Sequence, residues 1–557
     1  MKRWGFLVLM VLVVLAQSQT PVHGQAQNMT LEQKVGQLFL VTLYSTNLDQ
    51  ADRNFMAATY PGGVVLFPHN IQSPEQVTQL TNALQQYNIE IGVNVPMLIA
   101  VDQEGGVVTR LDAGFTRFPS ELLIGATDSE TDAMQIGTAM GEEMKAVGIN
   151  MNLAPVTDLY YPNGADRGNV LYRRVFGQSS EMVGRLAGGV INGLQAANVI
   201  GVLKHFPGHG AATTDSHSDL PIVTQTRDEI ETSTLLAFQG AINSGADAIM
   251  TGHLYYPALD PGFTRPATLS DVILNGILRE QMGFQGVIIS DAMDMGAIRQ
   301  NYGLAPAVIQ AINAGVDLIA FGPHLTLAEQ QSVIQATVEA ARTGAIPAER
   351  LDDAVNRAIQ LRQNYGLMNW VPQDVTSAST RLNLSGHQAI VRQVAQDAIT
   401  VLDNSKNMLP LDATQRILLI YPTDYADVSS ACAAYDFDVQ AYSVTYYPSA
   451  AEISTAVAMA QNADIVIVFV EDTIINAQQN ALAYALPPEK TIAVSMRGVD
   501  DWLQLPGPMS TIVLAYDSLP TVRAAVCDVL YGAAPAVGRV PVPIGPYSAG
   551  DGVDVVG

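Results

Sequence analysis

The chain has 557 residues, too many for one ordinary domain and suited to two or three. With 48% hydrophobic and 15% charged residues, it can bury a large core and is not expected to be disordered. A formal net charge of −25 argues against nucleic acid or an anionic lipid surface as a partner.

The first 26 residues have the features of a secretory signal peptide. The basic pair Lys2 and Arg3 precedes the apolar run 6–16, and small residues follow near positions 24 to 26. This run is shorter than the ~20 residues needed to span a bilayer. We therefore expect cleavage near residues 24–26 and an exported mature chain without a membrane span, with an uncleaved anchor as the alternative.

Residues 28–368 alternate short apolar segments with segments of helical period. The expected strands are Phe39–Leu43, Gly63–Phe67, Met97–Asp102, Asn150–Pro155, Val199–His205, Ala246–Thr251, Gly286–Asp291 and Asp317–Phe321. The expected helices include Pro74–Gln86, Asp132–Val147, Glu181–Ala197, Asp228–Ser244 and Pro306–Ala314. Alternating elements with fully apolar strands predict an α/β fold with a parallel sheet, and eight such units predict a (β/α)8 TIM-type barrel. An open doubly wound sheet is the alternative, but its nucleotide-binding and serine-hydrolase motifs are missing from the sequence.

Side chains capable of chemistry recur where the expected strands end. In a barrel these strand ends share the face that holds the active site. The residues concerned are Asp102, Lys204, His205, His253 and Asp291. His69, Asp158 and His324 follow other strands, and for these three we favour local hydrogen bonding within a loop.

A second, smaller, sandwich-like α/β domain is expected over residues 386–557. The polar segment 369–385, with little periodicity, is interpreted as a linker. Beyond it we expect one helix, four strands and a loose tail, which are Gln388–Thr400, Ile417–Tyr421, Ile465–Val470, Thr491–Ser495, Ile512–Tyr516 and Ala549–Gly557. The two cysteines, Cys432 and Cys527, exclude a disulfide-built scaffold, and their spacing leaves open whether they form one bridge.

The loop after the fifth strand is rich in histidine. A metal bound by His205, His209 and His217 is disfavoured, because the Pro-Gly pair after Phe206 prevents the helix that would align the first two. Asp215 and His217 are two residues apart, so on an extended loop their side chains point to the same side. The carboxylate can then orient the imidazole and favour its protonated form, which predicts a general acid near neutral pH.

Asp291 ends an apolar strand and is therefore held firmly at the rim, as a covalent nucleophile must be. Asp294 lies beyond the strand and is interpreted as a loop or helix-cap residue. Asp102 and Arg110 supply an acceptor and a fork of donors suited to the hydroxyl groups of a polar ligand, and Arg174 offers another donor. A surface salt bridge is the alternative for each arginine.

Together these segments resemble family-3 glycoside hydrolases, on the β-N-acetylglucosaminidase branch with two domains. The similar segments occur in family order and are Asp102–Gly106, Asn152–Val156, Arg174–Gly177, Lys204–Gly210, Asp215–His217, Pro266–Ser270 and Ser290–Ala297. The chain departs from the family pattern at His69, where an arginine is common, and in the blurred motifs of the second domain.

The resemblance implies a carbohydrate substrate and neither a cofactor nor a metal. Asp291 would be the nucleophile, with Asp215 and His217 as the acid/base pair on a mobile loop. The residues that would grip the sugar hydroxyls are Asp102, Arg110, Arg174, Lys204 and His205.

The resemblance also implies a reaction. We expect an exported β-N-acetylhexosaminidase that releases terminal β-linked N-acetylglucosamine from peptidoglycan fragments or chitin-type oligosaccharides by retaining double displacement. A neutral imidazole beside Asp291 would also tolerate phosphate, so an N-acetylglucosaminide phosphorylase stays an alternative. A β-glucosidase or β-xylosidase and, from another class, a non-catalytic cell-wall-binding protein are the others. The sequence does not predict the natural glycan or the oligomeric state.

Overall fold

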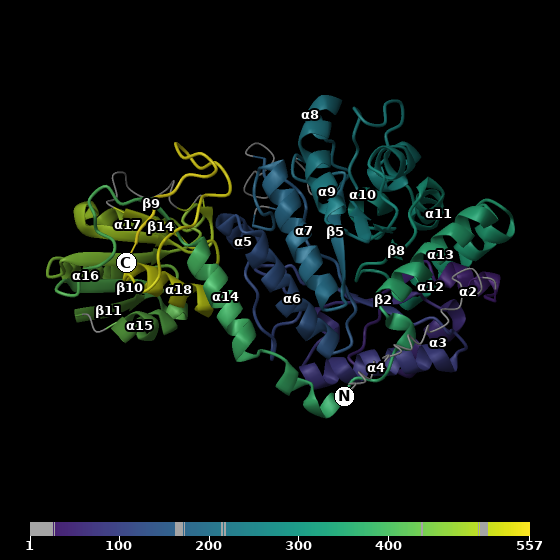
Figure 1. Ribbon diagram of the computed structural model, residues 1–557, viewed down its shortest axis with the longest axis horizontal. Helices are drawn as coiled ribbons and strands as arrows, with labels where there is room; N and C mark the ends of the chain where they lie inside the picture. The colour runs from purple at the N-terminus through teal and green to yellow at the C-terminus, as the bar shows by residue number, and fades with distance from the viewer. Residues whose placement is uncertain are drawn as a thin grey trace, which may run out of the picture.

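The computed structural model describes residues 26, 28–161, 171, 173–212, 216, 219–435, 438–499, 501 and 511–556. It contains an eight-stranded and a six-stranded sheet. The first, with its helices, fills the centre and right of Figure 1, and the second lies on the left. Within the described ranges, no helix is long and apolar enough to cross a membrane.

The first sheet is a closed parallel barrel. Its strands are β1 (Phe39–Val41), β2 (Gly63–Leu66), β3 (Leu98–Val101), β4 (Met151–Asn152), β5 (Ile200–Phe206), β6 (Ala248–Thr251), β7 (Val287–Ser290) and β8 (Ile319–Ala320). Each pairs with the next, β8 also pairs with β1, and a bridge between Ile289 and Leu318 closes the ring. All eight strands fall where the apolar segments predict them, which confirms the (β/α)8 barrel.

Helices surround this barrel (Figure 1). They are α2 (Leu31–Gly36), α3 (Gln50–Thr59), α4 (Pro74–Glu90), α5 (Glu121–Thr127), α6 (Glu130–Ala146), α7 (Ser180–Ala196), α8 (Arg227–Thr232), α9 (Thr234–Asn243), the π-helix Val272–Gln281, α10 (Gly296–Arg299), α11 (Leu304–Ala314), α12 (Leu327–Arg342) and α13 (Ala348–Asn364). The single helix expected over Asp228–Ser244 is divided at Ser233, whose φ of −122° and ψ of −88° are not helical. Inside the barrel, strand side chains such as Leu40, Val202 and Ile289 form their own apolar cluster, so the interior is packed and only its ends are available for a site.

The second sheet has the order β11-β10-β12-β13-β14-β9. Its strands are β9 (Thr400–Asp403), β10 (Arg416–Pro422), β11 (Asp438–Val444), β12 (Ile465–Val470), β13 (Thr491–Ser495) and β14 (Thr511–Leu514). All pairs are parallel except β14 with β9. The sequence did not predict β9, which begins where a helix was expected to end, or β11, an edge strand whose side chains are mostly exposed and lack an apolar run.

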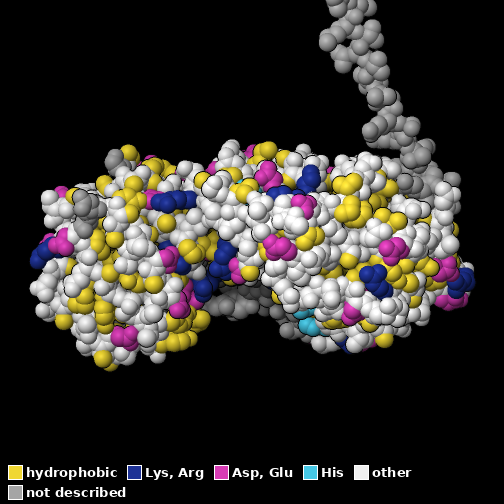
Figure 2. Space-filling view, turned by 90° about the horizontal axis from the view of Figure 1, so that it is seen from below, with side chains coloured by type: hydrophobic (Ala, Val, Ile, Leu, Met, Phe, Trp, Pro, Cys, Tyr) yellow, Lys and Arg dark blue, Asp and Glu magenta, His cyan; other side chains and the backbone are white. Residues whose placement is uncertain are grey.

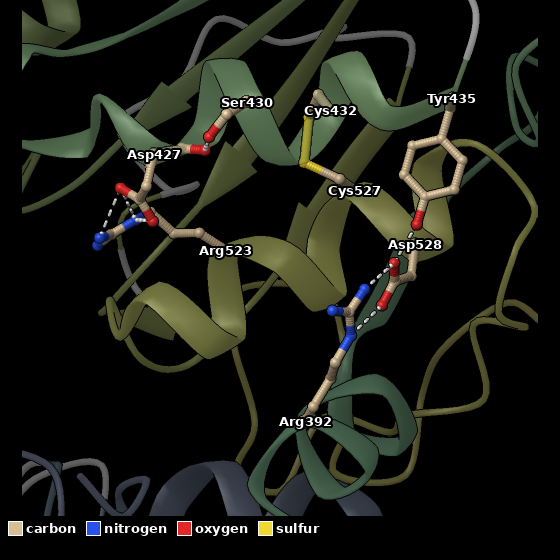
Figure 3. Close-up of a disulfide and its surroundings, with 8 residues drawn as sticks. All are labelled: Arg392, Asp427, Ser430, Cys432, Tyr435, Arg523, Cys527 and Asp528. Atoms are coloured by element: carbon tan, nitrogen blue, oxygen red, sulfur yellow. Dashed lines mark hydrogen bonds and ion pairs between the residues drawn. A yellow bond between two sulfur atoms is a disulfide. The ribbon is translucent and has the colours of Figure 1, made fainter. Parts of the chain in front are cut away.

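Five helices accompany this sheet. They are α14 (Ser385–Ala398), α15 (Asp427–Cys432), α16 (Ala450–Ala460), α17 (Ala477–Ala485) and α18 (Pro520–Leu530). Helix α18 packs against α14 and α15, and Cys527 of α18 forms a disulfide with Cys432 of α15 (Figure 3). The structure thus decides the pairing that the spacing of the cysteines left open.

Two segments expected to be loose are held by hydrogen bonds. In the segment interpreted as a linker, Arg381 donates to the carbonyl of Ala146 at 2.8 Å and the N–H of Asn383 donates to Glu143 at 2.8 Å, so it lies against the barrel. At the carboxyl end, the N–H of Val553 donates to the carbonyl of Val401 at 2.7 Å. The expectation of a loose tail is therefore wrong for its described part, residues 549–556.

Candidate active site

A cavity of about 460 Å³ lies at the carboxyl ends of the barrel strands. Every predicted site residue that the structure describes lines it, and these are Asp102, Arg110, Arg174, Lys204, His205 and Asp291. Asp215 and His217 lie outside the described residues. The rim position expected from the strand ends therefore brings together side chains that are up to 189 positions apart in the chain.

Asp291 follows directly on β7, whose four residues are all buried. Its N–H donates to the carbonyl of Thr251 on β6 at 3.2 Å, and its Oδ1 accepts from the N–H of Ala292 at 2.7 Å. Burial raises the pKa of this carboxyl, but His205, His253 and the Ala292 N–H together hold it below its ordinary value. Asp291 is thus an ionised carboxylate fixed at the cavity wall.

Glu104 is the centre of a buried charge cluster that the sequence analysis did not identify. Arg174 donates to both its oxygens, at 2.7 and 2.8 Å, and Nζ of Lys204 lies 2.6 Å from Oε1. The same ammonium group donates to Asp102 at 2.9 Å. Burial raises the pKa of Glu104, yet the two cations hold it far below its ordinary range, while Asp102 and Glu104 raise the pKa of Lys204 despite burial. All of these groups are charged at neutral pH.

Glu121, the first residue of α5, lies behind this cluster in the opposite protonation state. Its Oε1 accepts from the N–H of Val156 at 2.9 Å, and no hydrogen-bond partner of its Oε2 is found among the described atoms. Burial, and then the charge of Glu104, raise the pKa of Glu121 well above its ordinary value. Two buried glutamates side by side therefore differ, one ionised and the other neutral.

Asp158 orients His205. Its carboxylate lies 2.7 Å from Nδ1 of His205 and accepts from the backbone N–H groups of His205 and His209. Burial raises the pKa of Asp158, but His205 and His209 lower it further, so the carboxyl is ionised. The loop hydrogen bonds expected of Asp158 exist, and the same carboxylate fixes a ring that lines the cavity. Only the other ring nitrogen of His205 can meet a ligand.

Three further rim residues have local roles. His69 lies 3.0 Å from the carbonyl of Leu43, as expected of a loop residue. Asp294 accepts from the N–H of Gly322 at 2.6 Å and from that of His324 at 3.2 Å, so it ties the loops after β7 and β8 together. Both findings agree with the loop interpretation given to these residues.

His253 is fully buried behind Asp291. Its Nδ1 lies 2.7 Å from the Thr268 hydroxyl and its Nε2 lies 3.1 Å from the carbonyl of Ala292. Burial lowers the pKa of this imidazole, so it is neutral at pH 7 and supports the backbone at the end of β7.

Two features of the cavity wall are available to a ligand. Nε of Arg110 is buried and has no hydrogen-bond partner within the described part of the chain, so a bound hydroxyl group can serve as its acceptor. Ser216 also lines the cavity, where its hydroxyl lies 3.0 Å from Nε2 of His209 and its carbonyl accepts from the N–H of Ala297 at 3.2 Å. Within the described ranges, no group of three His, Cys, Asp or Glu side chains is arranged to hold a metal ion.

Glu104 and Asp158 are the residues that sequence reasoning missed or undervalued. Glu104 lies in the same motif as Asp102, and a signal for it existed, since two cations predicted at one buried rim need more than one counter-charge. Asp158 gave no comparable signal, because the fold alone brings it next to a histidine 47 positions away.

The chain resembles known proteins over nearly its whole length. Residues 30–361 match the glycosyl hydrolase family 3 N terminal domain. Beta-hexosaminidase A of Pseudoalteromonas piscicida is 33% identical over 462 residues, which cover 79% of this chain and 73% of that protein. A beta-hexosaminidase of Nitrosomonas eutropha is 37% identical over 287 residues, covering 50% of this chain and 79% of that one. A family 3 beta-N-acetylglucosaminidase structure from Paenibacillus sp. str. FPU-7 superposes with a TM-score of 0.82 at 32% identity, covering 92% of this chain and 99% of that one.

Proposed function

Because this chain belongs to glycosyl hydrolase family 3, we propose that it is an exported, retaining β-N-acetylglucosaminidase. Its substrates are peptidoglycan fragments or chitin-type oligosaccharides with a terminal β-linked N-acetylglucosamine. The observation that carries the proposal is the ionised carboxylate of Asp291, fixed at the end of β7 in the same cavity as the charge cluster of Glu104, Arg174 and Lys204. The relatives named beta-hexosaminidase support the choice of sugar.

In the first step, an oxygen of Asp291 attacks the anomeric carbon of the sugar. The bond to the leaving oxygen breaks as His217 gives that oxygen a proton, and a covalent glycosyl-enzyme forms. Asp215 orients His217 and favours its protonated form. The position of Ser216, between these two residues in the sequence and anchored in the cavity wall, supports their assignment to the acid/base role.

In the second step, the neutral imidazole of His217 accepts a proton from water. The water oxygen attacks the anomeric carbon from the side that the leaving group has vacated, and the bond to Asp291 breaks. Two inversions at one carbon retain the β configuration, and both side chains return to their starting states.

The charged cluster binds the sugar hydroxyl groups. Asp102 and Arg110 offer an acceptor and an unpaired donor toward the cavity, and the second ring nitrogen of His205 adds a third polar contact. These groups are held by partners before the sugar arrives, so binding costs little reorganisation.

Two observations support export. Residues 1–26 have the pattern of a secretory signal peptide. Cys432 and Cys527 form a disulfide, and such bonds persist mainly in oxidising compartments outside the cytosol.

The decisive experiment traps the intermediate. The protein is incubated with a fluorinated N-acetylglucosaminide and digested, and mass spectrometry is expected to find the sugar on the peptide that contains Asp291. Asp291→Asn should give no adduct, whereas Asp294→Asn, three residues away at the same rim, should still give it on Asp291. An adduct on another residue would overturn the assignment of the nucleophile.

Comparing chromogenic substrates tests the reaction itself. The N-acetylglucosaminide should be hydrolysed much faster than the glucoside or xyloside, and the first product should be the β-anomer. A strong glucoside preference would replace the proposed activity with that of a β-glucosidase. Release of a sugar phosphate when inorganic phosphate is added would indicate a phosphorylase, and binding without turnover would indicate a non-catalytic protein.

A further inference from the structure

Two adjacent arginines of the barrel bind carboxylates in different domains. Arg174 pairs with Glu104 in the cavity, whereas Nη2 of Arg173 lies 2.5 Å from Oδ1 of Asp472, two residues beyond β12 of the second domain. Basic and acidic side chains gather at this junction between the two lobes (Figure 2). The ion pair of Arg173 therefore joins the loop that carries Arg174 to the second domain.

Asp472 is itself firmly held. Its Oδ2 accepts from the hydroxyl of Tyr446 at 3.0 Å and from Arg497 at 3.3 Å, and its N–H donates to Asp501 at 3.1 Å. Burial raises the pKa of Asp472, but Arg173 and then Tyr446 and Arg497 lower it, so the carboxyl is ionised. Its φ of 54° lies in the left-handed region that residues other than glycine rarely adopt, a feature that concentrates at functional positions.

A second contact between the domains lies at the start of α5. Asp517, three residues beyond β14, accepts from the N–H of Ser120 at 2.8 Å, and the Ser120 hydroxyl donates to the carbonyl of Tyr516 at 3.1 Å. Ser120 caps α5, whose first residue, Glu121, lies against the charge cluster. Tyr516 also has a left-handed backbone, with φ of 61°. Loops at the carboxyl ends of two strands of the second sheet thus hold two segments of the barrel.

The two held segments also pack directly on each other. A Cβ built on Gly125 of α5 would lie 1.7 Å from the carbonyl oxygen of Phe176, so glycine is needed for this approach. The second domain binds this unit at its far end too, because the N–H of Arg539 donates to the carbonyl of Ala126 at 2.9 Å. Helix α5 and the loop 173–177 therefore form one support for the cluster, with the second domain attached at several points.

From these contacts we propose that the second domain positions the sugar-binding charges, with Asp472 as a positioning residue for Arg174. The inference rests on the proposed function, in which Arg174 belongs to the group that binds the sugar. Asp472 does not line the cavity and acts through Arg173, which fixes the backbone next to Arg174. Loss of the Asp472 charge is expected to let Arg174 leave its productive position and so to weaken sugar binding more than it slows the chemical steps.

The test is Asp472→Asn, which removes the charge and keeps the shape. KM for the N-acetylglucosaminide should rise on the order of tenfold while kcat changes by less than about threefold. The matched control is Asp427→Asn, which breaks an ion pair with Arg523 that lies wholly within the second domain, and this variant should keep the wild-type KM. A wild-type KM in folded Asp472→Asn, or an equal rise in the control, would overturn the proposal.

Arg173→Met approaches the same ion pair from the barrel and keeps the test valid if Asp472→Asn does not fold. It should raise KM to the same extent, and the double variant should be no worse than either single one, because both remove one interaction. Additive effects of the two substitutions would contradict the proposal.

Hydrogen exchange separates this inference from the proposed function, because it needs no substrate. Backbone amides of residues 173–178 should exchange faster in Asp472→Asn than in the wild type and the Asp427→Asn control. Unchanged exchange would overturn the positioning role even if the enzyme is active. Absence of N-acetylglucosaminide hydrolysis by the wild type would instead refute the proposed function and leave the exchange result to decide the positioning role.

Discussion

The two buried glutamates behind the cavity provide a test of the charge assignment. Glu104→Gln and Glu121→Gln are the same substitution at two neighbouring buried positions, with residue exposures of 4% and 3%. Glu104 receives three charge-assisted contacts from Arg174 and Lys204, between 2.6 and 2.8 Å. Glu121 receives one, from the backbone N–H of Val156, which a glutamine oxygen can equally accept.

The expected magnitudes follow from these contacts. In Glu104→Gln, Arg174 loses its bidentate carboxylate and Lys204 keeps only Asp102, so buried positive charge is left without full compensation. Breaking a buried ion pair in this way costs about 3–5 kcal/mol. In Glu121→Gln a carboxyl that is already neutral is replaced by a neutral amide, and the free energy of unfolding at pH 5 should fall by less than about 1 kcal/mol.

The pH dependence has opposite signs at the two sites. The folded-state pKa of Glu104 is lowered, so its contribution to stability is present above its unfolded pKa near 4.5 and is lost as pH falls below that value. The folded-state pKa of Glu121 is raised, so the stability of the wild type falls as pH rises from about 4.5 toward that folded-state value. Glu121→Gln lacks this loss and should gain on the wild type by up to about 1.4 kcal/mol per pH unit in that range.

Urea denaturation followed by circular dichroism between pH 4 and 8 measures both effects. Glu104→Gln should be strongly destabilised at pH 7 and should approach the wild type toward pH 4. Glu121→Gln should become relatively more stable as pH rises. Equal losses of stability in the two variants, or the reverse order, would refute the assignment of one ionised and one neutral glutamate.

Three further predictions follow from the proposed chemistry and the second domain. Asp291→Ala should lower kcat on the order of 10⁴-fold or more while calorimetry still detects N-acetylglucosamine binding; wild-type rates would mean that no covalent route through this residue exists. His217→Ala should lower kcat on the order of 10²- to 10⁴-fold for substrates with poor leaving groups and much less for nitrophenyl glycosides, and an equal loss for both would count against a general acid. Replacing Cys432 and Cys527 by serine opens a loop with a sequence separation of 95 residues (Figure 3) and should reduce the free energy of unfolding of the second domain by about 4–5 kcal/mol, and an unchanged urea midpoint would show that the disulfide adds nothing.

The sequence also predicted much of the candidate site, for a geometrical reason. In a parallel barrel every strand ends at the same rim, so Asp102, Lys204 and Asp291 had to converge once the strands were identified. Their partners could not be predicted in this way. Glu104 was passed over inside a motif, and Asp158 had only a loop role until the fold brought its carboxylate to His205.

The second domain marks the limit of sequence reasoning more sharply. Its four central strands are buried and apolar and were predicted, whereas β11 (Asp438–Val444) is an exposed edge strand without that pattern. The segment 369–385 is polar and was interpreted as a linker, yet its polar groups bond to the barrel. Polarity reports that a segment needs hydrogen-bond partners but not whether water or protein supplies them.

The sequence by itself determined the alternation of strands and helices, the barrel and the rim position of the chemistry, because these depend on periodicities of two and 3.6 residues that neighbouring side chains establish locally. Only the tertiary structure decided which charges meet. The pair of Lys204 with Glu104, the disulfide between Cys432 and Cys527 and the contact of Arg173 with Asp472 span 100, 95 and 299 positions. Such pairings depend on how whole elements pack in space, and no local pattern of residues encodes them.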